Sequence, residues 1–378
     1  MIVERIAIFG GTFNPVPREH VATAAAAVKE LKLDKIFIMP AFLPPHKNVS
    51  PAKPSDRINM LKIAFRALPQ AEISDFELVN GGKSYSYVTA EHFREKYKDA
   101  EIFMIVGGDM LKDFKTWKYP DRILSAVKLA VVLREGYFTD VESERGYFAE
   151  VFGKDFVTLD YVGKAVSSTA IRIRLAFGLK PQGISDEVTE YIRDCAVYPP
   201  DVYERYIIGH LPEKRVVHTA NVVILAMKKA KELGLDYEKV RIAATLHDCA
   251  KYDDYKKYDG FILPEGVPQP VVHAFLGAFV AEKVLGVTDA EVLDAIRYHT
   301  SGKANMSTLA KLIFVADMLE EGRNYEGVDI LRKEFDADFE SCFRLCIKEE
   351  TLHLLNKKQY VYAETVNAYD YYVNGKRS

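Results

Sequence analysis

The sequence predicts two domains, an α/β domain built on a parallel sheet followed by a domain made of helices alone. In the first half, short apolar runs alternate with amphipathic stretches, which is typical of a parallel sheet covered by helices on both faces. In the second half the apolar residues show helical spacing, and the strand pattern is absent. The 378 residues suit two domains better than one, and Pro199 and Pro200 interrupt the helical pattern. We therefore expect domains at residues 1–198 and 199–378.

The elements of each half follow from the positions of the apolar residues. Strands are expected at residues 6–9, 35–39, 101–106, 128–133 and 156–159, where the apolar runs are short. Helices are expected in the first half at residues 20–31, 55–68, 87–97, 121–126, 166–177 and 186–195. In the second half they are expected at residues 214–233, 237–251, 271–285, 289–299, 307–320 and 337–355.

Composition excludes several classes of protein. A net charge of −3 gives no bulk attraction to nucleic acid or to an anionic membrane, so any phosphate must be bound locally. The four cysteines have no C-x-x-C spacing, which argues against a disulfide framework and against a thiolate zinc site. The N-terminus is not a signal peptide, and no run of about 18 apolar residues is present. We therefore expect a soluble cytoplasmic protein without nucleic-acid or membrane partners, and the sequence leaves a homo-oligomer open.

The first candidate site lies where the first expected strand ends. This strand runs directly into residues 10–15 (GGTFNP), and a helix is expected to begin at His20. Glycines let backbone N–H groups approach a phosphate, and a helix N-terminus favours negative charge. Ligands of open α/β sheets bind at the carboxyl ends of the strands. The same glycines also suit a tight turn on steric grounds, so this segment alone leaves both interpretations open.

A second motif makes nucleotide binding the better interpretation. Residues 166–172 (VSSTAIR) open another expected helix, with hydroxyl residues at capping positions. Arg172 lies one turn inside this helix, within reach of an anion at its N-terminus. A capped helix with an arginine is commonplace by itself, but its combination with GGTFNP at this separation is much less common.

Together these segments resemble the nucleotidyltransferase superfamily that has a His-x-Gly-His motif. The closer resemblance is to bacterial nicotinate-mononucleotide adenylyltransferases, over roughly residues 1–198, and it implies a Rossmann-like sheet. GGTFNP, residues 44–47 (PPHK), residues 107–109 (GGD) with Trp117, and residues 167–172 (SSTAIR) carry it. The resemblance assigns to ATP the residues Gly10, Gly11, Thr12, Phe13, Ser168, Thr169 and Arg172. It assigns to the nicotinate nucleotide the residues Ser86, Gly108, Asp109 and Trp117.

The resemblance implies adenylyl transfer without a covalent intermediate. The 5′-phosphate of nicotinate mononucleotide would attack the α-phosphate of ATP in line, so positioning and electrostatic stabilisation would do most of the catalysis. His20, Lys47 and Arg172 are expected to neutralise the triphosphate, with Mg²⁺ bridging it. The chain departs from the family motif at two positions, because Pro17 replaces the first His and Glu19 replaces the Gly.

The second candidate site is a set of histidines and aspartates distributed over the expected helices. Its members are His218, His247, Asp248, His273, His299 and Asp317. A buried imidazole beside a buried carboxylate costs free energy unless something pairs with it, and a metal ion supplies that pairing. Imidazole and carboxylate ligands suit Fe, Mn, Zn or Ni. We expect Asp248 to be shared between two ions, with water between them as the nucleophile. His218, His247 and Asp317 would complete the first site, and His273 and His299 the second.

This arrangement resembles the HD-domain phosphohydrolase superfamily. The local sequences are closer to bacterial HD-type symmetrical diadenosine tetraphosphate hydrolases, over about residues 203–360. Residues 246–251 (LHDCAK), 295–302 (AIRYHTSG) and 315–320 (VADMLE) carry this resemblance. It implies an all-α bundle that cleaves a dinucleoside tetraphosphate into two nucleoside diphosphates at a di-iron centre. Lys251 and Arg297 are then candidate phosphate contacts, Lys251 with a catalytic role, although either could be a solvated charge.

Four interpretations of the whole chain follow. The leading one is a bifunctional enzyme that adenylates nicotinate mononucleotide with ATP and hydrolyses diadenosine tetraphosphate to two ADP. The second keeps the hydrolase and makes the first domain a degenerate nucleotide-binding or sensing module, because of Pro17 and Glu19. The third gives the first domain another adenylyl acceptor, such as phosphopantetheine or a flavin, against which Trp117 argues. The fourth gives the second domain a purely structural role, which would require a metal-free protein.

Overall fold

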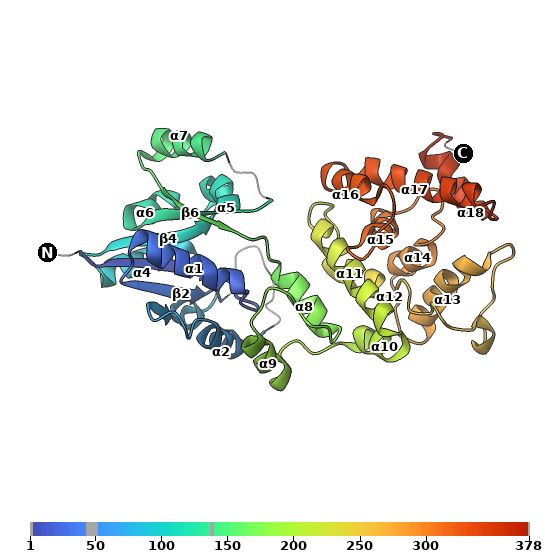
Figure 1. Ribbon diagram of the computed structural model, residues 1–378, viewed down its shortest axis with the longest axis horizontal. Coiled ribbons are helices and arrows are strands. Elements are labelled where there is room, and N and C mark those ends of the chain that lie inside the picture. The colour runs from blue at the N-terminus through green and yellow to red at the C-terminus, as the bar shows by residue number, and fades with distance from the viewer. Residues whose placement is uncertain (1–2, 43–51, 137–139, 377–378) are drawn as a thin grey trace. The chain divides into compact units, whose positions relative to one another are not determined.

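Two compact units make up the structure, a computed structural model that describes residues 3–42, 52–136 and 140–376. The first unit contains Met1–Arg172 and Pro181–Pro199, and the second contains Ile173–Lys180 and Pro200–Ser378. The first unit holds a sheet with helices around it, whereas helices alone form the regular elements described in the second (Figure 1). The predicted fold class is therefore confirmed for both halves.

The sheet of the first unit has six parallel strands in the order β3-β2-β1-β4-β5-β6. The strands are β1 (Arg5–Gly11), β2 (Lys35–Pro40), β3 (Ala71–Ile73), β4 (Glu101–Gly107), β5 (Lys128–Arg134) and β6 (Val157–Gly163). The direction of the strand order changes between β1 and β4. The chain leaves β1 toward β2 and one edge of the sheet, and it leaves β4 toward β5 and the other edge. Ligands of such sheets bind in the crevice at the carboxyl ends of the strands at this switch point.

Two details of the sheet differ from the sequence-based expectation. Strand β3 was not expected, because it has only three residues, none of them buried, and no apolar run marks it. Strand β1 continues through Gly10 and Gly11, which pair with Met39 and Pro40 of β2. The two glycines therefore belong to the end of a strand, and the turn begins after them.

Helices surround the sheet of the first unit (Figure 1). They are α1 (Arg18–Leu31), α2 (Pro54–Ala64), α3 (Phe76–Asn80), α4 (Ser86–Lys96), α5 (Gly108–Asp113), the 3-10 helix η1 (Phe114–Thr116), α6 (Pro120–Ala126), α7 (Val141–Phe152) and α9 (Asp186–Asp194). Helix α8 (Ser168–Ala176) begins in the first unit and ends in the second. One core cluster joins sheet residues such as Ile8, Phe37 and Met104 to residues of the helices.

The second unit is a bundle of helices around one large core. Its helices are α10 (Val202–His210), α11 (Glu213–Ala230), α12 (Tyr237–Leu246), the 3-10 helix η2 (Tyr255–Lys257), α13 (Gln269–Lys283), α14 (Ala290–Tyr298), α15 (Thr308–Leu319), α16 (Val328–Ala337), α17 (Phe339–Asn356) and α18 (Ala363–Tyr372). Helix α15 is apolar on all sides and largely buried, as expected for the central helix of a bundle. It delivers Asp317 near its C-terminal end. Among the described residues, no helix is long and apolar enough to cross a membrane.

Candidate functional site

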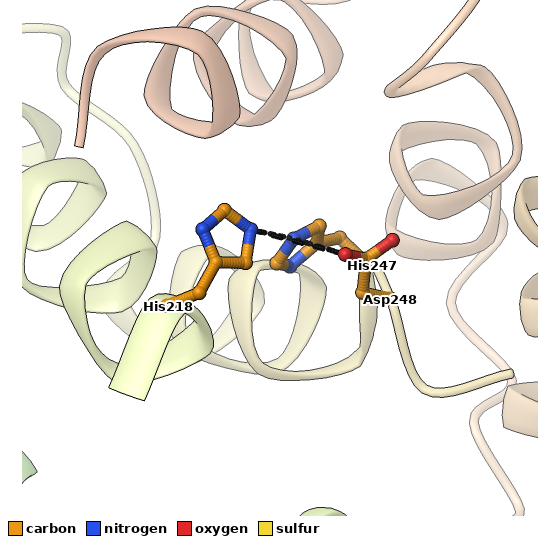
Figure 2. Close-up of side chains that lie close together, drawn as sticks. All are labelled: His218, His247 and Asp248. Atoms are coloured by element: carbon orange, nitrogen blue, oxygen red, sulfur yellow. Dashed lines mark hydrogen bonds and ion pairs between the residues drawn. The ribbon is translucent and has the colours of Figure 1, made fainter. Parts of the chain in front are cut away.

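The first group of candidate metal ligands converges between helices α11, α12 and α15. Nε2 of His218 lies 3.3 Å from Nε2 of His247, and 3.8 Å from Oδ2 of Asp248. Nε2 of His247 lies 3.6 Å from the same carboxylate oxygen. Figure 2 shows the three side chains pointing toward one another. Asp317 completes the predicted set, because its Oδ1 lies 3.1 Å from Nε2 of His218.

The second group uses the other oxygen of the same carboxylate. Oδ1 of Asp248 lies 3.0 Å from Nε2 of His273 and 3.4 Å from Nε2 of His299. The two imidazole nitrogens are 3.3 Å apart. Each group has the spacing of ligands that could hold a metal ion. Asp248 therefore lies between two sets of nitrogen ligands, with one oxygen facing each set.

Two of the histidines follow directly after the end of a helix. The sequence predicted them within helices, but α12 ends at Leu246 and α14 ends at Tyr298. Nδ1 of His247 donates a hydrogen bond to the Ala244 carbonyl at 2.7 Å, and Nδ1 of His299 donates to the Ile296 carbonyl at 2.7 Å. These bonds satisfy carbonyls that a helix end leaves without a partner. They also place the proton on Nδ1, so that the Nε2 lone pair faces the cluster.

His218 is oriented by a buried carboxylate that sequence reasoning had not assigned to the site. Its Nδ1 donates to Oε1 of Glu320 at 3.1 Å, and Asn221 donates to the other oxygen of Glu320 at 2.9 Å. Asp317 is oriented in a similar way by Arg323, whose guanidinium donates to the carboxylate and to the backbone carbonyl of Asp317. Hydrogen-bonded partners of this kind fix the orientation of metal-binding side chains.

The electrostatics of the cluster favour a charged Asp248 and neutral imidazoles at His247 and His273, whereas His218 differs. Burial lowers the pKa of His247 to about 3 and lowers the pKa of His273. Burial opposes the charge of Asp248, but the surrounding imidazoles hold the pKa of this carboxyl well below its usual range. Burial also opposes a charge on His218, yet hydrogen bonds to Asp317 and Glu320 raise its pKa.

The cluster fits divalent cations. Oδ1 of Asp248 is buried and accepts no hydrogen bond of ordinary geometry, although the two imidazole nitrogens described above face it. A buried carboxylate oxygen without a hydrogen bond is costly, and Nζ of Lys251 pairs with this oxygen at 3.3 Å. A bound metal cation would replace this pairing. Imidazoles and carboxylates are ligands that divalent transition metals accept, and no thiolate is required. The described residues therefore provide the ligands that such ions need.

Other polar groups surround the cluster, two of which sequence reasoning did not identify. Arg215 donates to Oδ2 of Asp248 at 2.7 Å, and the Thr300 hydroxyl lies 3.0 Å from Nε2 of His299. The predicted Lys251 does reach the site, with Nζ 2.9 Å from Nε2 of His273. A signal for Arg215 existed, because it precedes His218 by three residues and shares a helix face with it.

A cavity of about 580 Å³ opens beside the metal-ligand cluster. It is lined by His299, Thr300, Phe314, Asp317, Met318, Arg323, Tyr325, Glu326, Glu349, Glu350 and His353. His353 is an exposed residue that also lines this cavity. Arg297, a predicted phosphate contact, is half-buried on α14 and is not among the described residues lining the cavity.

We predict that Glu320→Gln weakens metal binding about tenfold, because the amide keeps the shape of the carboxylate but no longer raises the basicity of His218. Calorimetric titration of metal-free protein with Mn²⁺ measures this change. Glu321→Gln is the matched control, since Glu321 is an exposed neighbour whose carboxylate contacts Arg174 at 3.5 Å. Equal affinities for the wild type and Glu320→Gln would contradict the orienting role of Glu320.

The candidate site of the first unit lies at the carboxyl edge of its sheet. A small cavity of about 60 Å³ is bordered by Gly107 at the end of β4, Arg134 at the end of β5 and Gly163 at the end of β6. His20, in the first turn of α1, and Lys164 also line it. Two cationic side chains and a helix N-terminus thus face one cavity at the switch point of the sheet, which suits an anion.

His20 is held in this cavity by aromatic rings. Phe13 and Phe9 lie edge-on to its imidazole, with ring centroids 5.2 and 5.8 Å away. Phe13 was assigned to the nucleotide, but its side chain is 1% exposed and packs against His20. A side chain on Gly11 would come within 3.0 Å of the Phe13 ring, which explains the glycine there. Nδ1 of His20 is buried without a hydrogen-bond partner.

Glu19 and Pro17, which replace family residues, both line the same cavity. The Tyr161 hydroxyl donates to Oε1 of Glu19 at 2.6 Å, and a side chain on Gly163 would come within 3.0 Å of that oxygen. The carboxylate is therefore fixed beside His20 by a direct hydrogen bond. It places a negative charge in a cavity whose cationic lining residues are Arg134 and Lys164.

Arg172 and the hydroxyl residues of α8 contact the segment that follows β1. Arg172 donates to the Asn14 carbonyl at 2.7 Å and to the Thr169 hydroxyl at 3.0 Å. Ser168 donates to the Pro15 carbonyl at 3.3 Å. The structure thus brings the two sequence motifs together. Burial lowers the pKa of Arg172, and the nearby Tyr198 offsets this in part.

A buried arginine that the sequence did not indicate supports the same segment. Arg57 is 1% exposed, and its Nη1 donates to the carbonyls of Ala41 and Thr12 at 2.5 and 3.1 Å. Its Nε is buried without a partner. Arg57 thus ties the end of the first predicted motif to the segment after β2.

The residues assigned to the nicotinate nucleotide occupy neighbouring helix starts. Ser86 begins α4, and Gly108 and Asp109 begin α5 after β4. Oδ2 of Asp109 lies 3.5 Å from Nη1 of Arg134. Trp117 follows η1 and packs against Phe114 in the core. Lys47, predicted to contact ATP, lies outside the described residues.

We predict that the first unit loses stability as the pH falls from 6.5 to about 4, because burial and the nearby Arg134 lower the pKa of His20 to about 4. In this window the unfolded chain binds a proton that folded His20 rejects, so the free energy of unfolding falls by at most about 3 kcal/mol. Urea unfolding at both pH limits measures this through the fluorescence of Trp117, the single tryptophan. His20→Gln should lose this contribution, and an unchanged pH dependence in that variant would contradict the prediction.

Comparisons with known proteins agree with this geometry. Residues 8–174 match a cytidylyltransferase-like family, and residues 215–322 match the HD domain. A probable nicotinate-nucleotide adenylyltransferase of Clostridium tetani is 38% identical over 190 residues, which are 50% of this chain and 94% of that protein. A symmetrical bis(5′-nucleosyl)-tetraphosphatase of Bacillus subtilis is 37% identical over 172 residues, which are 44% of this chain and 92% of that protein.

One relative spans both halves. A probable nicotinate-nucleotide adenylyltransferase/Ap4A hydrolase of Mycoplasma pneumoniae is 26% identical over 351 residues, which are 90% of this chain and 97% of that protein. Both resemblances inferred from the sequence motifs are confirmed. The first half of the chain belongs to the nicotinate-nucleotide adenylyltransferase family, and the second half belongs to the HD-domain family of symmetrical bis(5′-nucleosyl)-tetraphosphatases.

Proposed function

We propose that the chain is a bifunctional nucleotide enzyme. Residues 1–198 transfer an adenylyl group from ATP to nicotinate mononucleotide, and residues 199–378 cleave diadenosine tetraphosphate into two ADP. Relatives of each half are named for these two activities, and relatives that span both halves carry both names. The two candidate sites lie in different units, so each activity is assigned to residues of one unit.

The observation that carries the hydrolase proposal is the position of Asp248 between two sets of imidazoles. This geometry supports a pair of transition-metal ions that share the carboxylate, with His218, His247 and Asp317 on one side and His273 and His299 on the other. We propose iron, with manganese, zinc and nickel as alternatives for the same ligands. When bound, such ions polarise a phosphoryl group and activate water.

The cationic side chains around the cluster have a separate role. Arg215, Lys251 and Arg323 surround the carboxylates and can pair with phosphate oxygens instead. Symmetrical cleavage adds water to a phosphorus atom and releases ADP, whose departing oxygen is stable as an anion near neutral pH. Cations that stabilise this oxygen are sufficient for such a leaving group, so no proton donor is needed.

The adenylyltransferase proposal rests on the meeting of GGTFNP and SSTAIR at the carboxyl edge of the sheet. His20 is neutral at pH 7 and offers an N–H to a phosphate oxygen, while Arg134 and Lys164 supply charge. The 5′-phosphate of the mononucleotide attacks the α-phosphorus of ATP, and pyrophosphate leaves with the electrons of the broken bond. Positioned donors lower the barrier by stabilising this charge, and Mg²⁺ would accompany the triphosphate.

A second candidate function of the first half is nucleotide binding without turnover. The observation that favours it is Glu19, whose carboxylate is fixed by Tyr161 inside the cavity that faces His20. Incubation of the full chain with ATP and nicotinate mononucleotide, followed by a pyrophosphate assay, separates the two functions. Pyrophosphate release supports transfer. ATP binding in calorimetry without pyrophosphate release supports the binding module.

The hydrolase proposal is tested by running the reaction in water enriched in oxygen-18 and identifying the nucleotide products and the position of the label. Diadenosine tetraphosphate should yield ADP alone, with one labelled oxygen for every two ADP molecules, because one water enters each cleavage. The label should reside in the terminal phosphate of ADP. Formation of ATP and AMP would contradict symmetrical cleavage.

A further inference from the structure

Two chemically different groups of residues line the cavity beside the metal-ligand cluster. One group belongs to the cluster or adjoins it in sequence, with His299, Thr300 and Asp317 among its residues. The other group comes from the segment after α15 and from α17, with Tyr325 and Glu350 among its residues. The volume of about 580 Å³ lies within the range of small-molecule sites and exceeds what a few phosphate groups fill.

The acidic residues of the second group are unsuited to phosphate. Glu326, Glu349 and Glu350 all line the cavity. Carboxylates repel a polyphosphate at short range, whereas the cluster offers metal ligands and cations such as Arg323. A dinucleoside polyphosphate is therefore expected to place its phosphates at the cluster and a nucleoside beside the acidic residues.

Glu350 is the acidic residue best placed to contact that nucleoside. It is half-buried on α17, and its carboxylate makes no hydrogen bond or ion pair with another described residue. An ionised carboxylate only accepts hydrogen bonds, so it selects a partner that donates. Nucleosides donate through an exocyclic amino group on the base and through the ribose hydroxyls.

Tyr325 supplies an aromatic surface beside this carboxylate. Its ring is 39% exposed, and its hydroxyl donates to the Met318 carbonyl at 3.2 Å, which fixes the ring in the wall of the cavity. The apolar side chains of Met318 and Phe314 line the same cavity. Every base can stack on an aromatic ring, whatever hydrogen-bond donors and acceptors the base carries. Discrimination between bases therefore needs a polar group such as Glu350.

We propose that the acidic residues and Tyr325 in the lining of this cavity form a nucleobase subsite, in which Tyr325 stacks on the base and Glu350 accepts a hydrogen bond from its exocyclic amino group. This inference rests on the proposed hydrolase function. It identifies the substrates as dinucleotides whose bases carry an amino group, with adenine as the base tested below.

The test compares diadenosine with diinosine tetraphosphate, because inosine replaces the amino group with an oxygen that repels a carboxylate. Wild-type protein should prefer the adenosine substrate in kcat/KM by about tenfold or more, the effect of one charge-assisted hydrogen bond. Glu350→Gln should reduce this preference to about twofold or less, since an amide can donate to the inosine oxygen. The 2′-deoxyadenosine substrate should behave like the adenosine substrate in both proteins.

Further variants keep the test decisive. Tyr325→Phe retains the ring and should keep near-normal kcat/KM, whereas Tyr325→Leu should lower it about tenfold. Glu340→Gln, on the same helix but paired with Lys311 at the surface, should leave the base preference unchanged. An unaltered preference in Glu350→Gln, or a loss shared equally by the adenosine and inosine substrates, overturns the subsite.

A binding measurement distinguishes an incorrect subsite proposal from an incorrect hydrolase proposal. Binding of ADP and of inosine diphosphate is measured by equilibrium dialysis, and the difference between wild type and Glu350→Gln isolates this cavity from the nucleotide site of the first unit. A selective loss of ADP binding without any cleavage of dinucleotides contradicts only the hydrolase. Cleavage that ignores the base, with identical ADP binding in both proteins, contradicts only the subsite.

Discussion

Asp248→Asn is expected to reduce diadenosine tetraphosphate hydrolysis by at least about 1,000-fold. This carboxylate faces both groups of imidazoles with separate oxygens, so its neutralisation removes the negative charge that both proposed ions share. A loss of this size corresponds to about 4 kcal/mol of transition-state stabilisation. The rate of ADP formation, measured with saturating metal and substrate, gives the change directly.

Two controls separate this loss from unfolding. Adenylyl transfer by the same preparation should change by less than about twofold, because its candidate site lies in the other unit. Asp259→Asn removes an exposed carboxylate from the segment after η2 and should leave hydrolysis unchanged. Retention of more than about a tenth of the wild-type hydrolysis by Asp248→Asn would show that the cluster is not the catalytic centre.

His20→Ala is expected to lower adenylyl transfer by about 100-fold to 1,000-fold. The imidazole is held edge-on by Phe13 and Phe9, and its unpartnered Nδ1 is buried at the carboxyl edge of the sheet. Loss of one preoriented donor to a developing negative charge has an effect of this order. Pyrophosphate release with ATP and nicotinate mononucleotide measures it, and kcat should fall more than KM rises.

His92→Ala is the matched control for this substitution. His92 belongs to the same unit, where it stacks on Phe76 at a centroid distance of 3.9 Å, and no sequence motif assigns it a role. It should change turnover by less than about twofold. Wild-type turnover in His20→Ala would reject the assignment of His20 and would favour a first domain that binds nucleotides by other residues.

The architecture was predictable because apolar periodicity reports it directly. Parallel strands and buried helices leave strong apolar runs in the sequence, and α15, with eight of its twelve residues buried, is an example. Strand β3 left no such signal, since its three residues pair through the backbone with little burial. The ends of α12 and α14 were also misplaced, because the imidazoles of His247 and His299 terminate them through bonds to their own backbone.

In the candidate sites, the sequence predicted only the residues that belong to recognisable motifs. The histidines and aspartates of the cluster carry a recognisable spacing, and the structure brings them together. Glu320 orients His218 through a contact between two helices, which no local pattern encodes, whereas Arg215 lies three residues before His218 and could have been suspected from that spacing. The role of Arg57 likewise depends on tertiary packing, because the sequence does not show whether an arginine is buried or exposed. Motifs thus identify the candidate reactive groups, whereas the residues that orient those groups can be identified only from the three-dimensional structure.

The central claim is that the helical half hydrolyses phosphates with ions held by the cluster around Asp248. Titration of metal-free protein with Fe²⁺ or Mn²⁺, with simultaneous measurement of bound metal and ADP formation, tests it most directly. We predict that hydrolysis rises with bound metal and reaches its maximum at two ions per chain, and that chelation abolishes it. Full hydrolysis by protein that contains no bound metal would contradict the claim.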